Sequence, residues 1–547
     1  MPGQRLEGIV IAETPHAEQP IAHARAQLTA FVGRTLRGPV NSPIVVHSFA
    51  DFQQMFGGLW QPSPLSYAVE HFFDQGGRHA VIVRVTNAAL PTTLTLRCER
   101  ESLSLEALAP GTREFLRASV DYDHVESDDA SFNLVVQRVR APGSERIEEQ
   151  EIFRNLTADP ASERFVGTVL LRSRLVRMRG KAPAARPNPT LMPGTNLPVG
   201  YVSSNPDGDD GRPLTDYDVI GSAPRRTGLF ALSDVEDLAF IYVPPLSRTT
   251  EVGASTLLVA AKFCREHHAL LIVDPPTQWD SPAAALQGVK ERNFHSDTAL
   301  MFYPRLVCMD RLRGRSEIFG NGGAVAGLLS RIEGSASAAL TKPEAEPLLR
   351  SGARLARDVT TADRWRLAQM GINTLQTVRS ADRNLPPLRT LACGASASSD
   401  WAYLGPRRFA QFVISAIERG TRWAIMSPHD PLTQQRVARQ VTTFLEELRA
   451  AGAFASVPAD DAFLVICDDR INELGDTTGT LNILIQLAAI HSGEFHSFMI
   501  THTVRGSTVR PVVINRLEAS LLMTDDLQRE VTIRVRHERD FIRVLAS

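Results

Sequence analysis

A glycine-rich stretch, IFGNGGAVAG at residues 318–327, is the first place in the sequence where cofactor chemistry can be tested. A dinucleotide-binding loop needs the spacing GxGxxG, because its glycines form the tight turn and let the backbone approach the pyrophosphate. Counted from Gly320, the third glycine position holds Val325, so the pattern fails. We interpret the stretch as a glycine-rich turn that leads into a helix.

Two further stretches carry residue types that enzymes use as nucleophiles or as general acids and bases. CGASASS begins at Cys393 and places Ser396 like the serine of a GxSxG elbow, but Ser398 replaces the final glycine and no strand-like run leads directly into it. Asp468 and Asp469 end an apolar run, where paired carboxylates could transfer protons, yet the sequence identifies no partner for them. We therefore predict no catalytic residues.

Candidate metal ligands also miss the spacings that coordination requires. An EF-hand loop begun at Asp207 in NPDGDDG would put Gly211 at position five instead of six, and would end at Asp218 instead of a glutamate. His267 and His268 are adjacent and lack the HExxH spacing that places two ligands on one helix face. We expect a solvated turn and boundary histidines, and we predict neither a metal nor a cofactor.

The elements that would position such residues follow an α/β pattern. SPLSYAVEHFFDQGGRHAVIVRV, residues 63–85, has apolar residues at helical spacing, then Gly76 and Gly77, then a run rich in β-branched residues. An anion site needs glycines before a helix, because the helix N-terminus carries the free N–H groups. Here the glycines follow the helix, where glycine is a favoured terminator. The stretch is therefore predicted to be scaffold.

Composition and length indicate an ordinary protein of several domains. The 547 residues exceed what one core usually contains, which predicts two to four domains. A formal net charge of -2 gives no electrostatic reason to expect nucleic-acid binding. The sequence contains neither an uninterrupted apolar run long enough to span a membrane nor an apolar signal-peptide core, so we expect folding in the cytoplasm. The five separated cysteines favour reduced core thiols.

The pattern changes twice along the chain. Alternating helix-like and strand-like pieces stop near Leu90, give way to alternating β-type segments, and resume near Gly228. Residues 25–90 and 225–520 are therefore expected to make one composite α/β core, with a β-rich domain inserted between them. The fold class is α/β, of mixed α+β character and multidomain.

The order of several segments resembles the tail sheath proteins of contractile bacteriophages and of contractile injection systems, including R-type pyocins. TAFVGRTLRGPVNSPIVVHSFADFQQMFGG resembles the N-terminal core block of that family, ALLIVDPP, ALMFYPRLV and GINTL follow in the middle, and WAYLGPRRFAQFVISAIERGTRWAIMSPHDP and FLVICDD come near the end. The opening MPGQRLEGIVIAE and the phrase LRTLACGAS depart from the family's pattern.

The resemblance implies a structural subunit that polymerises as stacked hexameric rings around an inner tube and contracts to drive the tube through a target envelope. It implies partners in further copies of the chain, the inner tube protein, and the baseplate and tail terminator proteins, without direct nucleic-acid contact or membrane insertion. The expected location is a virion tail or injection particle assembled in the bacterial host cytoplasm. The alternative is an α/β enzyme with an unrecognised active site.

With this resemblance the chain divides into six segments. They are an N-terminal linking arm (1–24), the N-terminal part of the core (25–90), an inserted β-rich outer domain (91–200), a middle α/β domain (201–390), a C-terminal α/β core domain (391–520) and a C-terminal linking arm (521–547).

Two sets of residues are predicted to make contacts between proteins. Extended terminal strands in LEGIVIAE and VTIRVRHE are candidates for donation to a neighbouring subunit, because β-strand addition can persist while domains rotate. The strand-forming residues are Ile9, Val10, Ile11, Val531, Ile533 and Val535. On the amphipathic helix RVARQVTTFLEELRAAGAF, the polar residues Arg436, Arg439, Glu446 and Glu447 either contact the tube or form a solvated face.

Overall fold

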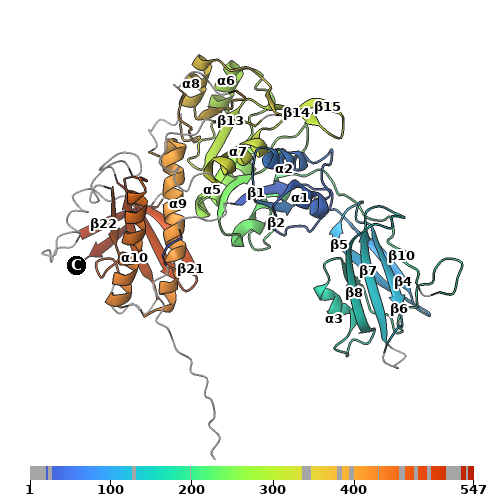
Figure 1. Ribbon diagram of the computed structural model, residues 1–547. Coiled ribbons are helices and arrows are strands. Elements are labelled where there is room, and N and C mark those ends of the chain that lie inside the picture. The colour runs from blue at the N-terminus through green and yellow to red at the C-terminus, as the bar shows by residue number, and fades with distance from the viewer. Residues whose placement is uncertain are drawn as a thin grey trace, which may run out of the picture. The chain divides into compact units, whose positions relative to one another are not determined.

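The computed structural model of the chain describes two compact units. One comprises Ala26–Gly334 and Glu346–Ala402, and the other Met1–Arg25, Ser335–Ala345 and Tyr403–Ser547 (Figure 1). We call them the larger unit and the smaller unit. The residues described are 20–22, 28–125, 131–197, 199–334, 347–350, 352–378, 385–393, 400–428, 430–454, 462–472, 479–488, 495–512, 531–537 and 540–546.

A seven-stranded sheet organises the larger unit. Its strands pair in parallel except for β2, which is antiparallel to β3 at one edge. In spatial order they are β17 (Ile372–Thr374), β13 (Ala299–Tyr303), β12 (Leu270–Val273), β11 (Leu238–Tyr242), β1 (Leu28–Gly33), β3 (Ala80–Arg84) and β2 (Ile44–Val46). The sheet thus joins strands from both sides of the insertion.

Helices cover both faces of this sheet, which is why its central strands are continuous apolar runs. On one face, Val32, Ile241 and Leu271 share a buried cluster with α5, α6 and α8. On the other face, the ring of Phe31 lies 5.4 Å from that of Phe72 in α2. The helices concerned are α2 (Pro64–Asp74), α5 (Ala254–Glu266), α6 (Pro282–Arg292), α7 (Gly322–Gly334) and α8 (Thr361–Gln369).

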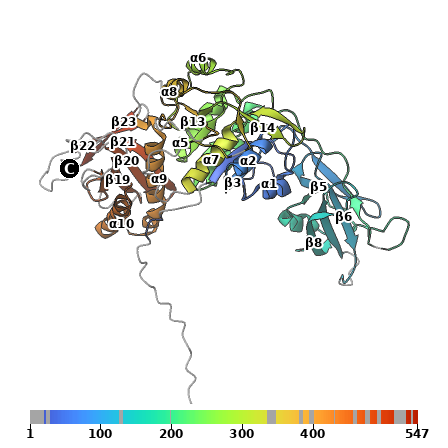
Figure 2. The same ribbon diagram turned by 45° about the horizontal axis from the view of Figure 1, so that its top comes forward.

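Helices α2 and α7 lie side by side in both views (Figures 1 and 2). A Cβ atom on Gly323 would come 2.2 Å from the carbonyl oxygen of Ala68, and one on Gly327 would come 2.2 Å from that of Phe72. Only glycine permits this approach, because such distances are far inside van der Waals contact. The stretch that looks like a cofactor loop is therefore a helix-packing surface, which follows β15 (Arg315–Phe319) as a turn into a helix.

Shorter elements complete the larger unit. Before α2, Ser48 caps α1 by accepting a hydrogen bond from the backbone N–H of Asp51. A small sheet in the order β15-β14-β16 adjoins α2, where the ring of Phe319 stacks on that of Tyr67. The remaining bounds are α1 (Phe49–Phe56), α4 (Asp216–Ile220), β14 (Leu306–Asp310) and β16 (Arg354–Leu355).

The insertion is a pair of antiparallel sheets around one apolar core. In the strand at 102–110, Leu103, Leu105, Ala107 and Ala109 are buried and the residues between them are half-buried or exposed, as expected when one face packs and the other meets water. One sheet has the order β4 (Pro91–Arg97), β5 (Ser102–Pro110), β9 (Val176–Arg179), and the other β10 (Val202–Ser203), β6 (Leu116–Asp121), β7 (Ser131–Val139), β8 (Ile147–Thr157). A short helix, α3 (Val166–Val169), lies between β8 and β9 in the chain.

The two chain segments that connect the insertion to the core run antiparallel and are hydrogen-bonded to each other. The N–H of Leu90 donates to the carbonyl of Asp209 at 2.9 Å, and the N–H of Asp209 donates back at 3.0 Å. Asp207 accepts from the backbone N–H of Thr93 at 2.8 Å, and Asp210 from that of Thr112 at 2.8 Å. We call this pair of segments the neck. The aspartates of NPDGDDG therefore tie the neck together, where the sequence predicted a solvated turn.

The smaller unit packs two helices on an antiparallel sheet. Val413 of α9 and Val441 of α10 share its buried core with Ile483 and Ile500. The helices are α9 (Leu404–Gly420) and α10 (Pro431–Ala450), and the sheet has the order β18 (Phe463–Ile466), β19 (Leu481–Leu487), β20 (His496–Thr503), β21 (Gly506–Val512). Two further strands, β22 (Val531–His537) and β23 (Asp540–Ala546), pair as an antiparallel hairpin.

The predicted α/β multidomain class is confirmed, but the strands after residue 403 differ from the expected single core. The composite sheet reaches only to Thr374, whereas the strands from Phe463 onward form their own sheet. The reason lies in the connections: strands joined through helices become parallel neighbours, whereas strands that follow one another closely pair antiparallel.

Candidate functional site

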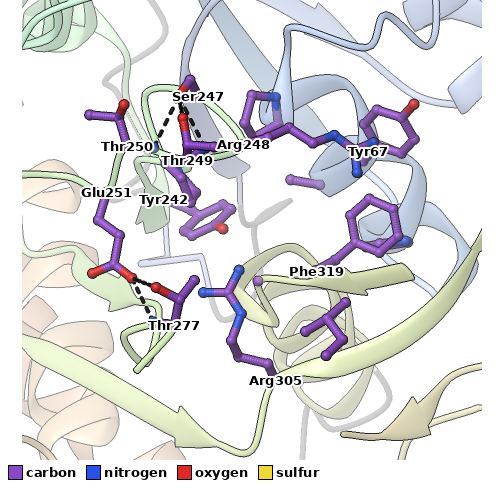
Figure 3. Close-up of a pocket in the computed structure, with 16 residues that line it drawn as sticks. Tyr67, Tyr242, Ser247, Arg248, Thr249, Thr250, Glu251, Thr277, Arg305 and Phe319 are labelled. Carbon is purple, nitrogen blue, oxygen red and sulfur yellow. Dashed lines mark hydrogen bonds between the residues drawn. The ribbon is translucent and has the colours of Figure 1, made fainter. Parts of the chain in front are cut away.

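The carboxyl edge of the seven-stranded sheet is where an α/β enzyme would place its site. Strands β1 and β11 are neighbours, but the chain continues from β1 toward β3 at one edge and from β11 toward β12 at the other. Such a reversal of strand order is a topological switch point, where α/β folds bind ligands. A pocket does lie here (Figure 3). It is lined by the segments that follow β11, β12 and β13, together with α2 and the end of β15.

Asp274 directly follows β12 at this edge of the sheet. The hydroxyl of Tyr242 donates to one of its carboxylate oxygens at 2.6 Å, and the backbone N–H of Gly322 donates to the other at 2.8 Å. Burial raises the pKa of Asp274, although Arg305 and these hydrogen bonds act in the opposite direction. The carboxylate is thus committed to joining β11, β12 and the start of α7.

Asp310 joins the small sheet to α2 beside the same pocket. It accepts hydrogen bonds from Arg248 at 2.9 Å, Gln61 at 2.9 Å and the Tyr67 hydroxyl at 3.1 Å. Burial alone would raise its pKa, but backbone N–H groups of Leu312 and Arg313 and these side chains lower it. Asp310 is therefore a buried carboxylate whose two oxygen atoms both accept hydrogen bonds within the protein, so neither is available to a ligand.

The pocket itself is small. Its volume is about 50 Å³, whereas small-molecule sites usually measure about 300–1,000 Å³. Thr277 donates to Glu251 across one wall, through both its backbone N–H and its hydroxyl (Figure 3). This edge has room for a few water molecules but not for a nucleotide, and we interpret it as a structural junction.

The candidates weighed from the sequence are dispersed. His267 ends α5 and its ring stacks on Phe263, with centroids 4.0 Å apart, while burial lowers its pKa. Asp468 pairs with its neighbour Arg470. Ser396 lies outside the described residues. Within the part of the chain that the structure describes, no group of three or more His, Cys, Asp or Glu side chains could hold a metal ion.

The proposed tube-contact residues all lie on α10. Arg439 and Glu447 are exposed, and Arg436 and Glu446 are half-buried. The guanidinium of Arg436 stands 5.0 Å from the ring centroid of Trp423, and Glu446 pairs with Arg449 at 2.9 Å. The helix thus presents charged groups of both signs.

The proposed arm residues lie at the two ends of the chain. Ile9, Val10 and Ile11 fall outside the described residues. Val531, Ile533 and Val535 lie in β22, where they pair with Ala546, Val544 and Ile542 of β23. The strand predicted from the alternating pattern is thus present, and its described partner is the last strand of the same chain.

The sheet of the smaller unit has an edge strand at each end. Among the described strands, β18 pairs only with β19 and β21 only with β20. Most of β21 is exposed or half-buried, and it contains Pro511, a residue that sheets tolerate at edges. The sequence reading missed β21, although β-branched residues on both sides of Arg505-Gly506 are a hairpin signal that could have found it.

The fold itself is that of contractile sheath proteins. It matches the sheath tail protein of Listeria innocua at 14% identity, covering 89% of this chain and 97% of that one with a TM-score of 0.57. It also matches the contracted sheath of the PVC extracellular contractile injection system (13% identity, 90% and 97% covered, TM-score 0.50). The contracted helical sheath of the anti-feeding prophage matches similarly (15% identity, 90% and 98% covered, TM-score 0.50).

The predicted resemblance is therefore confirmed at the level of the fold. No protein-family model matches the sequence, and no curated protein matches it either. In the described residues, no helix combines the length and apolarity needed to cross a membrane.

Proposed function

We propose that this chain is a structural subunit of a contractile sheath and not an enzyme. The observation that carries the proposal is the match to sheath structures over about nine-tenths of the chain and nearly the whole of each relative. The pocket also supports it, because the site at the edge where an α/β enzyme would bind its ligand has a volume of only about 50 Å³.

In this proposal the chain stacks as hexameric rings around an inner tube, and contraction drives the tube through a target envelope. Its partners are other copies of the chain, the tube protein, and the baseplate and tail terminator proteins. The particle is a virion tail or an injection device assembled in the bacterial cytoplasm. The insertion, 91–200, forms an outer domain between the core segments 25–90 and 201–390, and 391–520 forms the C-terminal core domain.

The links between subunits are strands added to open edges. An unpaired edge offers a row of N–H and C=O groups to another chain. The edges of β18 and β21 are suited to accept strands, and the terminal segments 1–24 and 521–547 are suited to donate them. Hydrogen bonds made in this way hold while the connecting segments bend, so rigid units can rotate without separating.

The experiment is to purify the full chain and image it by negative stain alongside size-exclusion chromatography. We expect rings, tubes or sheath-like polymers. The matched variant carries Asp234→Ala, which removes only an exposed ion pair with Arg226 and should polymerise like the wild type. A chain that stays monomeric at every concentration, alone and with its tube protein, would contradict the proposal.

A further inference from the structure

A β-hairpin of the larger unit exposes a group of arginines and large apolar side chains. It is formed by β14 and β15, which pair antiparallel from Leu306 and Phe319 at its base to Asp310 and Arg315 near its tip (Figure 1). Gly314 closes the turn, because its φ of +65° suits glycine and its N–H donates to the carbonyl of Asp310 at 2.8 Å. We call residues 306–319 the arginine hairpin.

The side chains of the arginine hairpin differ in burial from one position to the next. Leu306 and Phe319 are buried, and the ring of Phe319 stacks on that of Tyr67 in α2. Met309 and Ile318 belong to the alternate set and are exposed, as is Leu312 in the turn. One side of the hairpin therefore packs on the core, while the other offers apolar surface to a partner.

Positive charge lies outermost on this hairpin. The side chains of Arg311, Arg313 and Arg315 are 64%, 43% and 66% exposed. The carboxylates that pair with them are far less accessible, since Glu70 is 4% exposed and Glu317, which Arg313 and Arg315 share, is 14% exposed. A guanidinium has five N–H donors, so each of these arginines can bind a further carboxylate at the surface.

The neighbouring charges leave this surface positive. Arg248 pairs with the buried Asp310 at 2.9 Å and with Glu317. Asp74, which is exposed on α2, acts electrostatically on Arg311, and the exposed Arg354 of β16 adds a cation opposite Val307. The exposed charged groups named here are thus one carboxylate, Asp74, and the four arginines Arg311, Arg313, Arg315 and Arg354. Such a surface favours an acidic partner.

The same chain contains a segment of the opposite charge. Residues 121–129, which run from the end of β6 toward the start of β7, read DYDHVESDD and include five carboxylates without a lysine or arginine. Of the two acidic residues here that the structure describes, Asp123 is exposed, whereas Asp121 is half-buried and accepts the side-chain amide of Asn133 at 2.7 Å. The segment, which we call the acidic segment, therefore complements the arginine hairpin in charge.

We propose that the arginine hairpin of one copy binds the acidic segment of another copy. Arginine and carboxylate groups form strong, often bidentate hydrogen bonds, and contact with Leu312 and Met309 removes apolar surface from water. The proposal deepens the proposed function and rests on it, because a sheath brings copies of the chain together. It gives the β-rich insertion a binding role between subunits, alongside the strands added at sheet edges.

The first test does not require polymerisation. The full chain is titrated into a fluorescently labelled peptide of residues 119–131, and the anisotropy of the peptide is measured. We expect saturable binding at low salt that weakens as salt is added, because exposed charges are screened. A peptide whose Asp and Glu residues are replaced by Asn and Gln should not bind. A folded wild-type chain that does not bind the acidic peptide would overturn the proposal.

Variants of the full chain locate the contact. Arg313→Glu combined with Arg315→Glu should weaken peptide binding about tenfold or more, because two attractive charge pairs become repulsive. Lys262→Glu combined with Lys290→Glu makes the same change of net charge at exposed positions of α5 and α6 and should bind like the wild type. Circular dichroism shows whether the variants are folded, and Gln in place of Glu at both arginines serves if they are not. Equal losses in the two double variants would overturn the proposal.

An exchange of charges tests the contact between whole copies. Either the hairpin double variant or Asp128→Arg combined with Asp129→Arg should lower the fraction of chain that sediments as polymer at low salt, and combining all four changes should restore it. Polymers that neither reversal affects would overturn this proposal and leave the proposed function standing. A wild-type chain that stays monomeric under all conditions would contradict both.

Discussion

The carboxyl edge of the seven-stranded sheet and the edges of the smaller sheet use their polar groups in opposite ways. At the carboxyl edge, Asp274 is half-buried and Asp310 is buried, and both take hydrogen bonds from several elements at once. Along β21, the backbone lies at the surface, with one side unpaired among the described strands. The first region uses most of its polar groups internally, although Arg305 Nε and Asn321 Oδ1 are buried without a partner, whereas β21 is hydrogen-bonded only to β20 among the described strands.

This difference separates two uses of one α/β chain. An enzyme keeps its unsatisfied groups at the switch point, where loops surround a ligand. Here the switch point is a hydrogen-bonded junction, and in the proposed function another polypeptide binds at the sheet edges instead. The contrast supports a protein that binds further copies of itself. Each of the two regions can be tested separately.

The largest effect is expected from the arm. Deleting Val531–Ser547, or replacing Ile533 by proline to remove a ladder donor, should abolish sheath formation and leave a folded monomer. Electron microscopy and size-exclusion chromatography measure the first outcome, and circular dichroism the second. A truncated chain that polymerises normally would exclude this linkage, and one that unfolds would instead indicate that β22 serves its own subunit.

The next effect is expected at the closed edge. Asp310→Ala removes the buried acceptor that Arg248, Gln61 and Tyr67 share, although Arg248 keeps Glu317, and should lower the free energy of unfolding of the larger unit by about 3–5 kcal/mol. Asp234→Ala, which breaks an exposed pair, should cost less than about 1 kcal/mol. Urea denaturation compares the two. Equal losses would mean that the carboxyl edge is not the hydrogen-bonded junction described above.

Acid should weaken the smaller unit before the larger. His502 is buried between Thr421 and Ser507, and burial lowers its pKa to about 4. The unfolded chain takes up a proton near pH 6.5 and the folded chain does not, so stability is lost as the pH falls from 6.5 toward 4, by about 3 kcal/mol in total.

In the larger unit, the buried neighbours His71 and Glu70 change stability in opposite directions over the same pH range. Burial lowers the pKa of His71 to about 4, which costs stability below pH 6.5, and raises that of Glu70 to about 7, which adds stability as the pH falls from 7 to 4.5. Hydrogen exchange of peptides from each unit at pH 7.5 and pH 5 checks the difference. Parallel loss of protection in both units would contradict it.

The smallest effect on stability is expected at the charged face of α10. Arg439→Glu should change the free energy of unfolding by less than about 0.5 kcal/mol, because the side chain is exposed. If this face contacts the tube, the same change should weaken tube binding at low salt. Lys262→Glu, on an exposed position of the larger unit, is the control. Tube binding that is unchanged at low salt would leave α10 a solvated face.

The sequence predicted what depends on local pattern. Apolar runs such as LAFIY and ALMFY identified buried parallel strands, because a strand covered on both faces is apolar throughout. Helix, glycine and strand order was equally local: Gly76 has a φ of +98° just after α2, a conformation that glycine adopts without strain. The order of these segments was enough to predict the sheath fold.

Contacts between distant residues could not be predicted in this way. Gly323 and Gly327 look like part of a phosphate loop until the backbone of α2 is seen against them. Asp310 is one acidic residue among many in the sequence, and its partner Arg248 is 62 positions away. His47 and His79 come together because of the register in which β2 and β3 pair, and the sequence alone does not determine that register.

The neck has a consequence for how this protein can change. Leu90 and Asp209 exchange hydrogen bonds in both directions, so the points where the chain leaves and re-enters the core are about 5.5 Å apart, as in any directly bonded antiparallel pair. Between these two points the core holds the insertion through Arg84, which donates to the carbonyl of Pro110 at 2.7 Å, and Arg37, which pairs with Glu148 at 2.7 Å. A foreign domain with adjacent termini could therefore replace the insertion if it supplied acceptors for these two buried arginines, or if they were replaced as well.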